Sequence, residues 1–335
     1  MKKKSKSVIK MTSVIVLLVC ILCGLTLISV SIGSARYSLN EVITNLFAEG
    51  DNNIKIIIYN LRLPRIICAI LIGAALSVGG ALLQAVMRNP LADPGTIGVS
   101  AGASTVVTTV LLVFPGMTTA VPIFAFVGAA FACALIYILA WKDGVDPVRI
   151  ILSGVAINSV LGGYTGFLQM LHSDNLQGVL GFLNGSLAGR SWGDVRILVI
   201  YVTIGLILAL FCIKSANALQ LGDEMAKNLG INVNLNRIAL SAVAAFLAAA
   251  TVSVAGMIGF VGLVVPHIAR MIVGSDYKIM VPTSMLLGAV VLLFADTLGR
   301  TIVPGMDIPV GTIMAISGGP FFLYMLRKKG KISGN

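Results

Sequence analysis

Long apolar runs constrain the fold of this chain more than any other feature. A helix that crosses a bilayer needs about 20 consecutive apolar residues, and lipid leaves no alternative to helices for runs of this length, because it cannot satisfy open backbone groups. A transmembrane barrel would instead show short alternating segments. Ten candidate spans follow from the pattern, at residues 8–32, 64–87, 96–114, 119–140, 149–170, 194–213, 237–256, 258–273, 280–300 and 310–326.

The composition agrees with this interpretation. Hydrophobic residues make up 57% of the 335 residues and charged residues only 11%, whereas a soluble domain is about one quarter charged. We therefore expect an all-α polytopic membrane protein in which residues 1–335 form a single transmembrane domain. Small residues at helix-packing spacing, Gly73/Ser77, Gly98/Gly102 and Gly162/Gly166, predict close helix contacts.

The distribution of basic residues predicts the orientation. An even number of spans places both termini on one side, and the excess of Lys and Arg at the two ends of the chain predicts that this side is the cytoplasm. The net charge of +11 would suggest nucleic-acid binding in a soluble protein, but here topology explains it. The first apolar run is longer than the hydrophobic region of a signal peptide, so we expect it to remain as a span.

Residues for catalysis or metal binding are scarce. No phosphate-binding loop of the type G-x-x-x-x-G-K-[ST] occurs, so we expect no nucleotide hydrolysis by this chain. The two histidines, His172 and His267, are too few for a metal site, and the five cysteines lie in apolar runs. The sequence therefore predicts no catalytic residue, no metal and no cofactor.

Charges inside the spans are also scarce, and these usually mark ion-coupled transport. Asp296 is the one candidate, and Arg300 at i+4 predicts a helical ion pair. The other polar residues within spans, such as Gln84, Asn158 and Gln169, are uncharged. This pattern favours a pathway for a bulky solute over a proton-driven carrier.

The loop 214–236 predicts a contact with another protein. Asp223 and Glu224 suit the first turn of a short helix, Ala226 and Leu229 are expected on one face, and Gly230 can end the helix. An ordinary helix at the membrane surface is the alternative.

Several motifs occur in order along the chain. They are Arg62-Leu63-Pro64-Arg65, residues 88–95, 97–103, 221–231, 259–270, Ala295-Asp296 with Arg300, and residues 308–311. Together, from about residue 36 to 327, the chain resembles the FecCD-type permeases of ABC importers for iron–siderophore, haem and cobalamin.

This resemblance implies a type II ABC importer permease fold in a bacterial plasma (inner) membrane. It implies three kinds of partner: a second permease subunit, identical or paralogous; two cytoplasmic ABC ATPases; and an extracytoplasmic binding protein. No nucleic acid is expected.

The resemblance also assigns residues to each face. Arg62, Arg65 and Arg300 match outer arginines that pair with glutamates of the binding protein, a task for which the guanidinium fork suits carboxylates. Asn89, Pro90 and Leu91 lie where the family narrows its cytoplasmic gate. The residues that match the family's ATPase-coupling segment are Leu221, Gly222, Asp223, Glu224, Ala226, Leu229 and Gly230.

The expected function is ATP-driven import of an iron(III)–siderophore complex by alternating access. Haem and cobalamin are the alternative substrates. An ion-coupled secondary transporter and an intramembrane enzyme are alternatives of other classes; the first lacks charges within the spans, and the second lacks a nucleophile and base or metal ligands.

Overall fold

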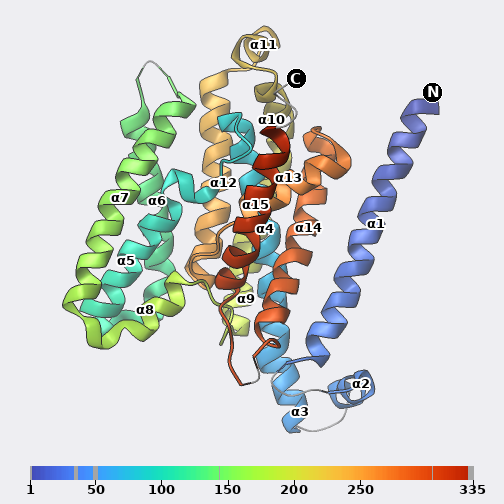
Figure 1. Cartoon of the computed structure of the whole chain (residues 1–335), viewed down its shortest axis with the longest axis vertical. Coiled ribbons are helices and arrows are strands. Elements are labelled where there is room, and N and C mark those ends of the chain that lie inside the picture. The colour runs from blue at the N-terminus through green and yellow to red at the C-terminus, as the bar shows by residue number, and fades with distance from the viewer. Residues whose placement is uncertain (1, 34–36, 48–51, 143, 304, 331–335) are drawn as a thin grey trace.

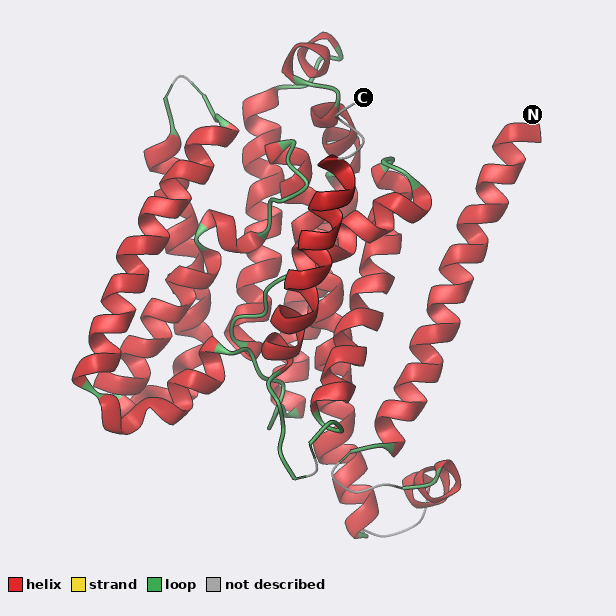
Figure 2. Cartoon of the chain, viewed as in Figure 1, coloured by secondary structure: helices red, strands yellow, loops and turns green. Residues whose placement is uncertain are grey.

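The structure is a computed structural model that describes residues 2–33, 37–47, 52–142, 144–303 and 305–330. Within these ranges the chain is built from helices and loops, without strands (Figure 2), which confirms the all-α fold. The long helices are α1 (Lys2–Ser31), α4 (Leu63–Met87), α5 (Val99–Val113), α6 (Val121–Ala140), α7 (Pro147–Leu171), α9 (Trp192–Phe211), α12 (Val233–Ala255), α13 (Val261–Val273), α14 (Tyr277–Gly299) and α15 (Val310–Gly330).

Short helices join them. These are α2 (Leu39–Phe47), α3 (Asn53–Ile56), α8 (Leu176–Leu183), α10 (Ile213–Gln220) and α11 (Asp223–Asn228), with the π-helix η1 (Ile57–Arg62) and the 3-10 helices η2 (Pro94–Ile97), η3 (Pro115–Ala120) and η4 (Ser173–Asn175).

Each of the ten expected spans overlaps one long helix. Among the described residues, seven helical segments are long and apolar enough to cross a membrane, whereas α5, α13 and the apolar part of α15 are shorter. Two of these three helices begin directly after residues with left-handed backbone conformation. Gly98 at φ +78° precedes α5, and Gly256 at φ +72° and Phe260 at φ +66° precede α13. Glycine adopts this left-handed region at little cost, so the sequence interrupts the helices at these points.

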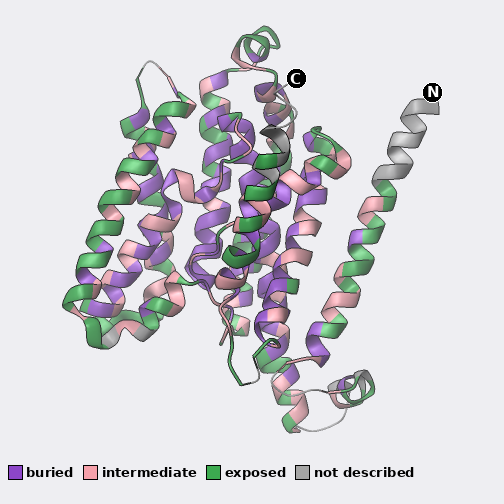
Figure 3. Ribbon diagram, in the orientation of Figure 1, coloured by how far each residue is buried: buried purple, intermediate pink, exposed green. Residues whose placement is uncertain are grey.

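Helix α4 forms the centre of the bundle and is buried along most of its length (Figure 3). It packs against α14 where the two backbones nearly touch, because a Cβ atom on Gly73 would lie 2.2 Å from the carbonyl oxygen of Gly288. Ser77 donates a hydrogen bond to the carbonyl of Ser284 at 2.8 Å. The predicted role of Gly73 and Ser77 in helix packing is thereby confirmed.

The other two predicted small-residue pairs differ. Gly102 packs against Gly128 of α6, where an added Cβ would lie 2.2 Å from a carbonyl oxygen, which confirms a close α5–α6 contact. Gly162 and Gly166 of α7 have no atom within 4 Å of such a Cβ. At these two glycines, therefore, no other described residue of this chain packs closely against α7.

The bundle has two distinct ends. Helix α11, the start of α1 and the end of α15 lie at one end, here named the α11 end (Figure 1). Helices α2 and α3 and the loop between α14 and α15 lie at the opposite end, here named the α3 end (Figure 1). This arrangement agrees with two termini on one side of the membrane; that this side is the cytoplasm stays a prediction.

Candidate functional site

At the α11 end, a helical hairpin carries the predicted coupling segment. Gly222 at φ +103° turns the chain after α10, and Gly230 at φ +78° ends α11. The N–H of Ile231 donates to the carbonyl of Ala226 at 3.0 Å, and that of Gly230 to the carbonyl of Lys227 at 2.9 Å. These two bonds form a Schellman motif, which uses glycine because its left-handed conformation is strained for other residues. A short helix ended by Gly230 is therefore confirmed.

The surface of this helix is apolar on its outer side. Leu221, Met225 and Leu229, spaced four residues apart, leave 56–62% of their surface exposed, and we name these three residues the apolar stripe. Ala226 is instead fully buried, so the expected sharing of one face by Ala226 and Leu229 is wrong. The reason is local: Leu229 is the C-cap residue, where the chain leaves the helix. The two acidic residues Asp223 and Glu224 lie in the first turn.

A buried arginine holds α11 on the bundle. Arg237 of α12 donates to Asp223 at 2.9 Å and to the carbonyl of Val145, in the α6–α7 loop, at 2.8 Å. Asp223 also lies 3.9 Å from Arg88, the residue that ends α4. Asp223 therefore ties α11 to α12 and to the end of α4, and Arg237 extends this contact to the α6–α7 loop. No local sequence pattern predicts the role of Arg237, because its partner lies in a separate helix.

The predicted gate residues follow Arg88 directly. Arg88 has φ +47°, and the Asn89 side chain accepts a hydrogen bond from the N–H of Leu91 at 2.9 Å. Asn89 and Pro90 line a cavity of about 290 Å³, and Leu91 is exposed. The structure thus brings the gate residues next to the coupling segment through Arg88 and Asp223. Their role as a gate stays a prediction.

The three predicted docking arginines lie together at the α3 end, but they are only 5–8% exposed. Arg62 donates to the carbonyl of Val30 at the end of α1, and its guanidinium carbon lies 5.0 Å from the centre of the Tyr37 ring. Arg300 donates to the carbonyl and hydroxyl oxygens of Ser29. These guanidinium groups therefore bind groups within the chain, and their role in docking stays a prediction.

Asp296 is the physical reason for much of this burial. Its carboxylate is 1% exposed and lies between Arg65 at 3.0 Å and Arg300 at 3.2 Å. A buried carboxylate requires such compensation. The predicted Asp296–Arg300 ion pair is confirmed, and Arg65 is an additional partner that the sequence analysis missed. Arg65 also binds Asp307, whose side chain is 47% exposed, at 2.7 Å.

Groups suited to catalysis do not gather in the part of the chain that the structure describes. No three side chains from His, Cys, Asp and Glu lie close enough there to hold a metal ion. His172 lies 3.2 Å from the carbonyl of Leu168 through Nδ1. Cys20 and Cys23 are exposed on α1, and Cys68 and Cys133 are buried. The described residues thus form one surface at the α11 end and one at the α3 end. A polar link, the contacts of Asp223 with Arg237 and Arg88, lies beside the predicted gate.

Comparison with known proteins gives a consistent result. The sequence profile of the FecCD transport family matches residues 17–328. The chain is 40% identical to the Fe(3+)-citrate import system permease protein YfmE of Bacillus subtilis over 328 residues, covering 98% of each chain. It is 38% identical to the heme-iron transport system permease protein IsdF of Staphylococcus aureus, covering 92% of this chain and 94% of that protein.

Two further relatives extend the comparison. The iron(3+)-hydroxamate import system permease protein FhuG of Bacillus subtilis is 35% identical, with 97% and 98% of the two chains covered. Among solved structures, a metal-chelate type ABC transporter in an inward-facing conformation matches with a TM-score of 0.84 and 27% identity, over 95% of this chain and 99% of the other.

Proposed function

Because the chain belongs to the FecCD transport family, we propose that it is the membrane-spanning permease of an ABC importer for iron(III) chelates. Support comes from the relatives, whose names specify ferric citrate, ferric hydroxamate and heme iron. The chain is not an enzyme; a separate subunit hydrolyses ATP. The observation that carries the proposal is this family membership, over nearly the whole chain, combined with an exposed apolar stripe at one end of the bundle.

The proposed substrate is an iron(III)–siderophore complex, with a small chelator such as citrate as the first choice. The two relatives from Bacillus subtilis at 40% and 41% identity are both named for ferric citrate import. Haem is the second candidate, because the heme-iron permease is only slightly less similar. Cobalamin remains the third candidate from the sequence analysis.

The apolar stripe is the proposed contact with the ATPases. Leu221, Met225 and Leu229 lie beyond the ends of the long helices, so we place them in water at the cytoplasmic surface. Exposed apolar clusters in water mark interaction sites. Two such hairpins, one from each permease subunit, would each dock into a cleft of one ATPase.

The polar link around Asp223 is the proposed route from motor to gate. Closure of the ATPases would move α11, and Asp223 joins α11 to Arg237 and to Arg88, which precedes the gate residues. A rigid α11 and a two-position gate would then give alternating access. A second permease subunit completes the pathway in this proposal.

The α3 end is the proposed face for the binding protein. Docking through Arg62, Arg65 and Arg300 requires them to exchange internal partners for carboxylates of that protein. The Arg65–Asp307 bond is the most exchangeable of these, because Asp307 is nearly half exposed. Asp296 would remain paired with both arginines during docking.

Uptake by cells tests the proposed function. A strain that lacks this gene should lose accumulation of radiolabelled iron supplied as citrate, and the gene on a plasmid should restore it. Iron hydroxamate, haem and labelled cobalamin are measured in parallel. A variant with Leu221, Met225 and Leu229 changed to Ser, present at normal membrane level, should fail to restore uptake. Unchanged uptake of all four substrates in the deletion strain would contradict the proposal.

A further inference from the structure

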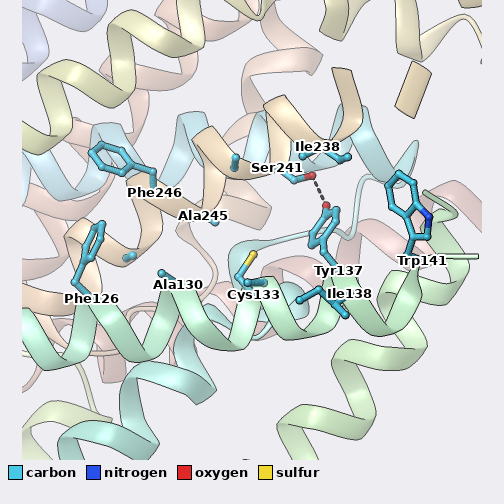
Figure 4. Close-up of a pocket in the computed structure, with 13 residues that line it drawn as sticks. Phe126, Ala130, Cys133, Tyr137, Ile138, Trp141, Ile238, Ser241, Ala245 and Phe246 are labelled. Atoms are coloured by element: carbon cyan, nitrogen blue, oxygen red, sulfur yellow. Dashed lines mark hydrogen bonds between the residues drawn. The ribbon is translucent and has the colours of Figure 1, made fainter. Parts of the chain in front are cut away.

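An apolar groove runs between α6 and α12. It encloses about 670 Å³ and is lined by side chains of both helices (Figure 4). Small side chains create it: Ala130 and Ala134 of α6 face Ala242, Ala245 and Ala249 of α12. Larger residues flank these alanines. A groove of this size on a bilayer-facing surface must be filled, because empty space forfeits the dispersion contacts of its lining.

The polar atoms of the groove are already satisfied. Tyr137 donates its hydroxyl hydrogen to Ser241 across the two helices (Figure 4). At one end, Phe126 packs against Phe246, with ring centres 5.8 Å apart. The remaining lining is aliphatic apart from Cys133 and Trp141. Apart from the indole of Trp141 at one end, the groove therefore presents an apolar lining to its occupant, which suits a hydrocarbon chain.

The groove is long enough to span one leaflet. Its lining extends along α6 from Phe126 to Trp141, which at 1.5 Å per residue is about 22 Å. One half of the hydrocarbon core is about 15 Å thick. A lipid chain that enters at the Trp141 end would fit along this length. Trp141 lies at the α11 end of α6, is exposed, and is a residue type enriched at membrane interfaces.

Positive charge gathers beyond Trp141. Lys142 and Arg149 are exposed and line a second hollow of about 520 Å³ together with Lys227. Arg149 donates to the backbone carbonyl of Lys142 at 3.1 Å, which holds the Arg149 guanidinium beside residue 142.

The two described acidic residues that line this hollow, Asp146 and Asp223, already accept hydrogen bonds within the chain. Asp146 accepts hydrogen bonds from the N–H groups of Val148 and Arg149, and Asp223 binds Arg237. Asp143, which follows Lys142 in the sequence, lies outside the described residues. Among the described residues, no ion pair joins Lys142, Arg149 or Lys227 to a carboxylate.

We propose that this groove binds an anionic phospholipid of the cytoplasmic leaflet, with one acyl chain between α6 and α12 and the phosphate beside Lys142 and Arg149. Charge complementarity selects an anionic headgroup, as basic pockets at the cytoplasmic ends of helices do in other membrane proteins. The site is independent of the transported substrate. It lies beside Arg237, the residue that holds α11, so bound lipid would steady the coupling hairpin.

Tryptophan fluorescence tests the proposal, because the chain has only two tryptophans. In a Trp192→Phe variant, Trp141 is the sole reporter. The purified full chain is titrated with phosphatidylglycerol or phosphatidylcholine brominated on the acyl chain. We expect quenching at several-fold lower concentration of the anionic lipid. Lys142→Gln and Arg149→Gln should each reduce that preference about fivefold, whereas Lys278→Gln, at the same end but outside the site, should leave it unchanged.

A groove-filling variant separates the acyl site from general surface charge. Ala134→Phe should abolish saturable quenching by both lipids, and Ala239→Phe, an exposed α12 position outside the lining, should not. Equal quenching by the two headgroups in the parent would overturn the anionic assignment. Absence of saturable quenching in the parent would overturn lipid as the occupant of the groove.

Discussion

Replacement of the apolar stripe provides a quantitative test of the coupling end. The change is Leu221→Ser, Met225→Ser and Leu229→Ser, singly and together. Each side chain is more than half exposed, and each points away from the bundle. The substitutions should therefore leave the permease folded and weaken only its contact with the ATPase.

The magnitude follows from the exposed fraction. Complete burial of a Leu or Met side chain contributes about 1.5–3 kcal/mol, and 56–62% of each residue is still exposed before docking. Each side chain thus has about 1–2 kcal/mol left to contribute. A single substitution should weaken ATPase binding about 5- to 25-fold, and the triple change, if the effects add, about a hundredfold to about ten thousandfold.

Binding of the purified ATPase to the detergent-solubilised permease measures this effect. Met306→Ser is the matched control, because Met306 is 62% exposed but lies at the α3 end. The control should bind the ATPase normally, and the helical content of every variant should equal that of the parent. If the triple variant binds the ATPase within twofold of the parent, the assignment of the stripe as the docking surface is refuted.

Three other changes test separate parts of the structure. Gly230→Val should destabilise the hairpin by about 1–2 kcal/mol through backbone strain at φ +78°, and should lower substrate uptake per ATP hydrolysed in proteoliposomes. Gly116→Val, at an exposed position without positive φ, should leave uptake per ATP unchanged. Equal uptake per ATP in the two variants would contradict the role of the hairpin. Asp296→Asn leaves the buried Arg300 without a carboxylate and Arg65 with Asp307 alone. This change should destabilise the permease by about 3–5 kcal/mol, measured as a lower thermal midpoint than that of Asp307→Asn. The N–H of Lys278 and the amide of Asn217 hold the pKa of Asp276 below its ordinary value. The stabilising contribution of Asp276 is therefore present above about pH 4 and is lost as pH falls through its folded-state pKa. Asp276→Asn should reduce the loss of thermal stability at acid pH. An unchanged dependence of the thermal midpoint on pH would contradict this prediction.

Local sequence signals predicted the ten long helices and the end of α11. Apolar runs located one long helix for each expected span, and Gly230 predicted the end of α11, because both depend on neighbours within a few residues. The Gly73–Ser77 pair likewise predicted a close helix contact. What the pattern could not supply was the partner helix.

The polar contacts of the two ends depended on distant partners. Arg65 meets Asp296 across 231 positions of the sequence, and no periodicity predicts such a pair. The sequence predicted only the Asp296–Arg300 pair, whereas the structure buries all three arginines around Asp296, Ser29 and Val30. For the same reason, the sequence did not predict that Arg237 of α12 binds Asp223 of α11.

Because the three arginines are buried, a docking experiment must distinguish lost docking from lost folding. Changing all three arginines to Glu would place new carboxylates beside Asp296 and destabilise the α3 end by repulsion. Loss of uptake in that variant would not separate docking from folding. Asp307→Asn frees Arg65 from one internal partner while Asp296 stays paired, so we expect binding-protein affinity to be maintained or increased in this variant.

The energy source of transport tests the central claim most directly. The permease is reconstituted in proteoliposomes with its ATPase and binding protein, and accumulation of labelled iron(III) citrate is followed. We predict accumulation that requires ATP and persists when ionophores abolish all ion gradients. Accumulation driven by a proton or sodium gradient in the absence of ATP would contradict an ABC importer and favour an ion-coupled carrier.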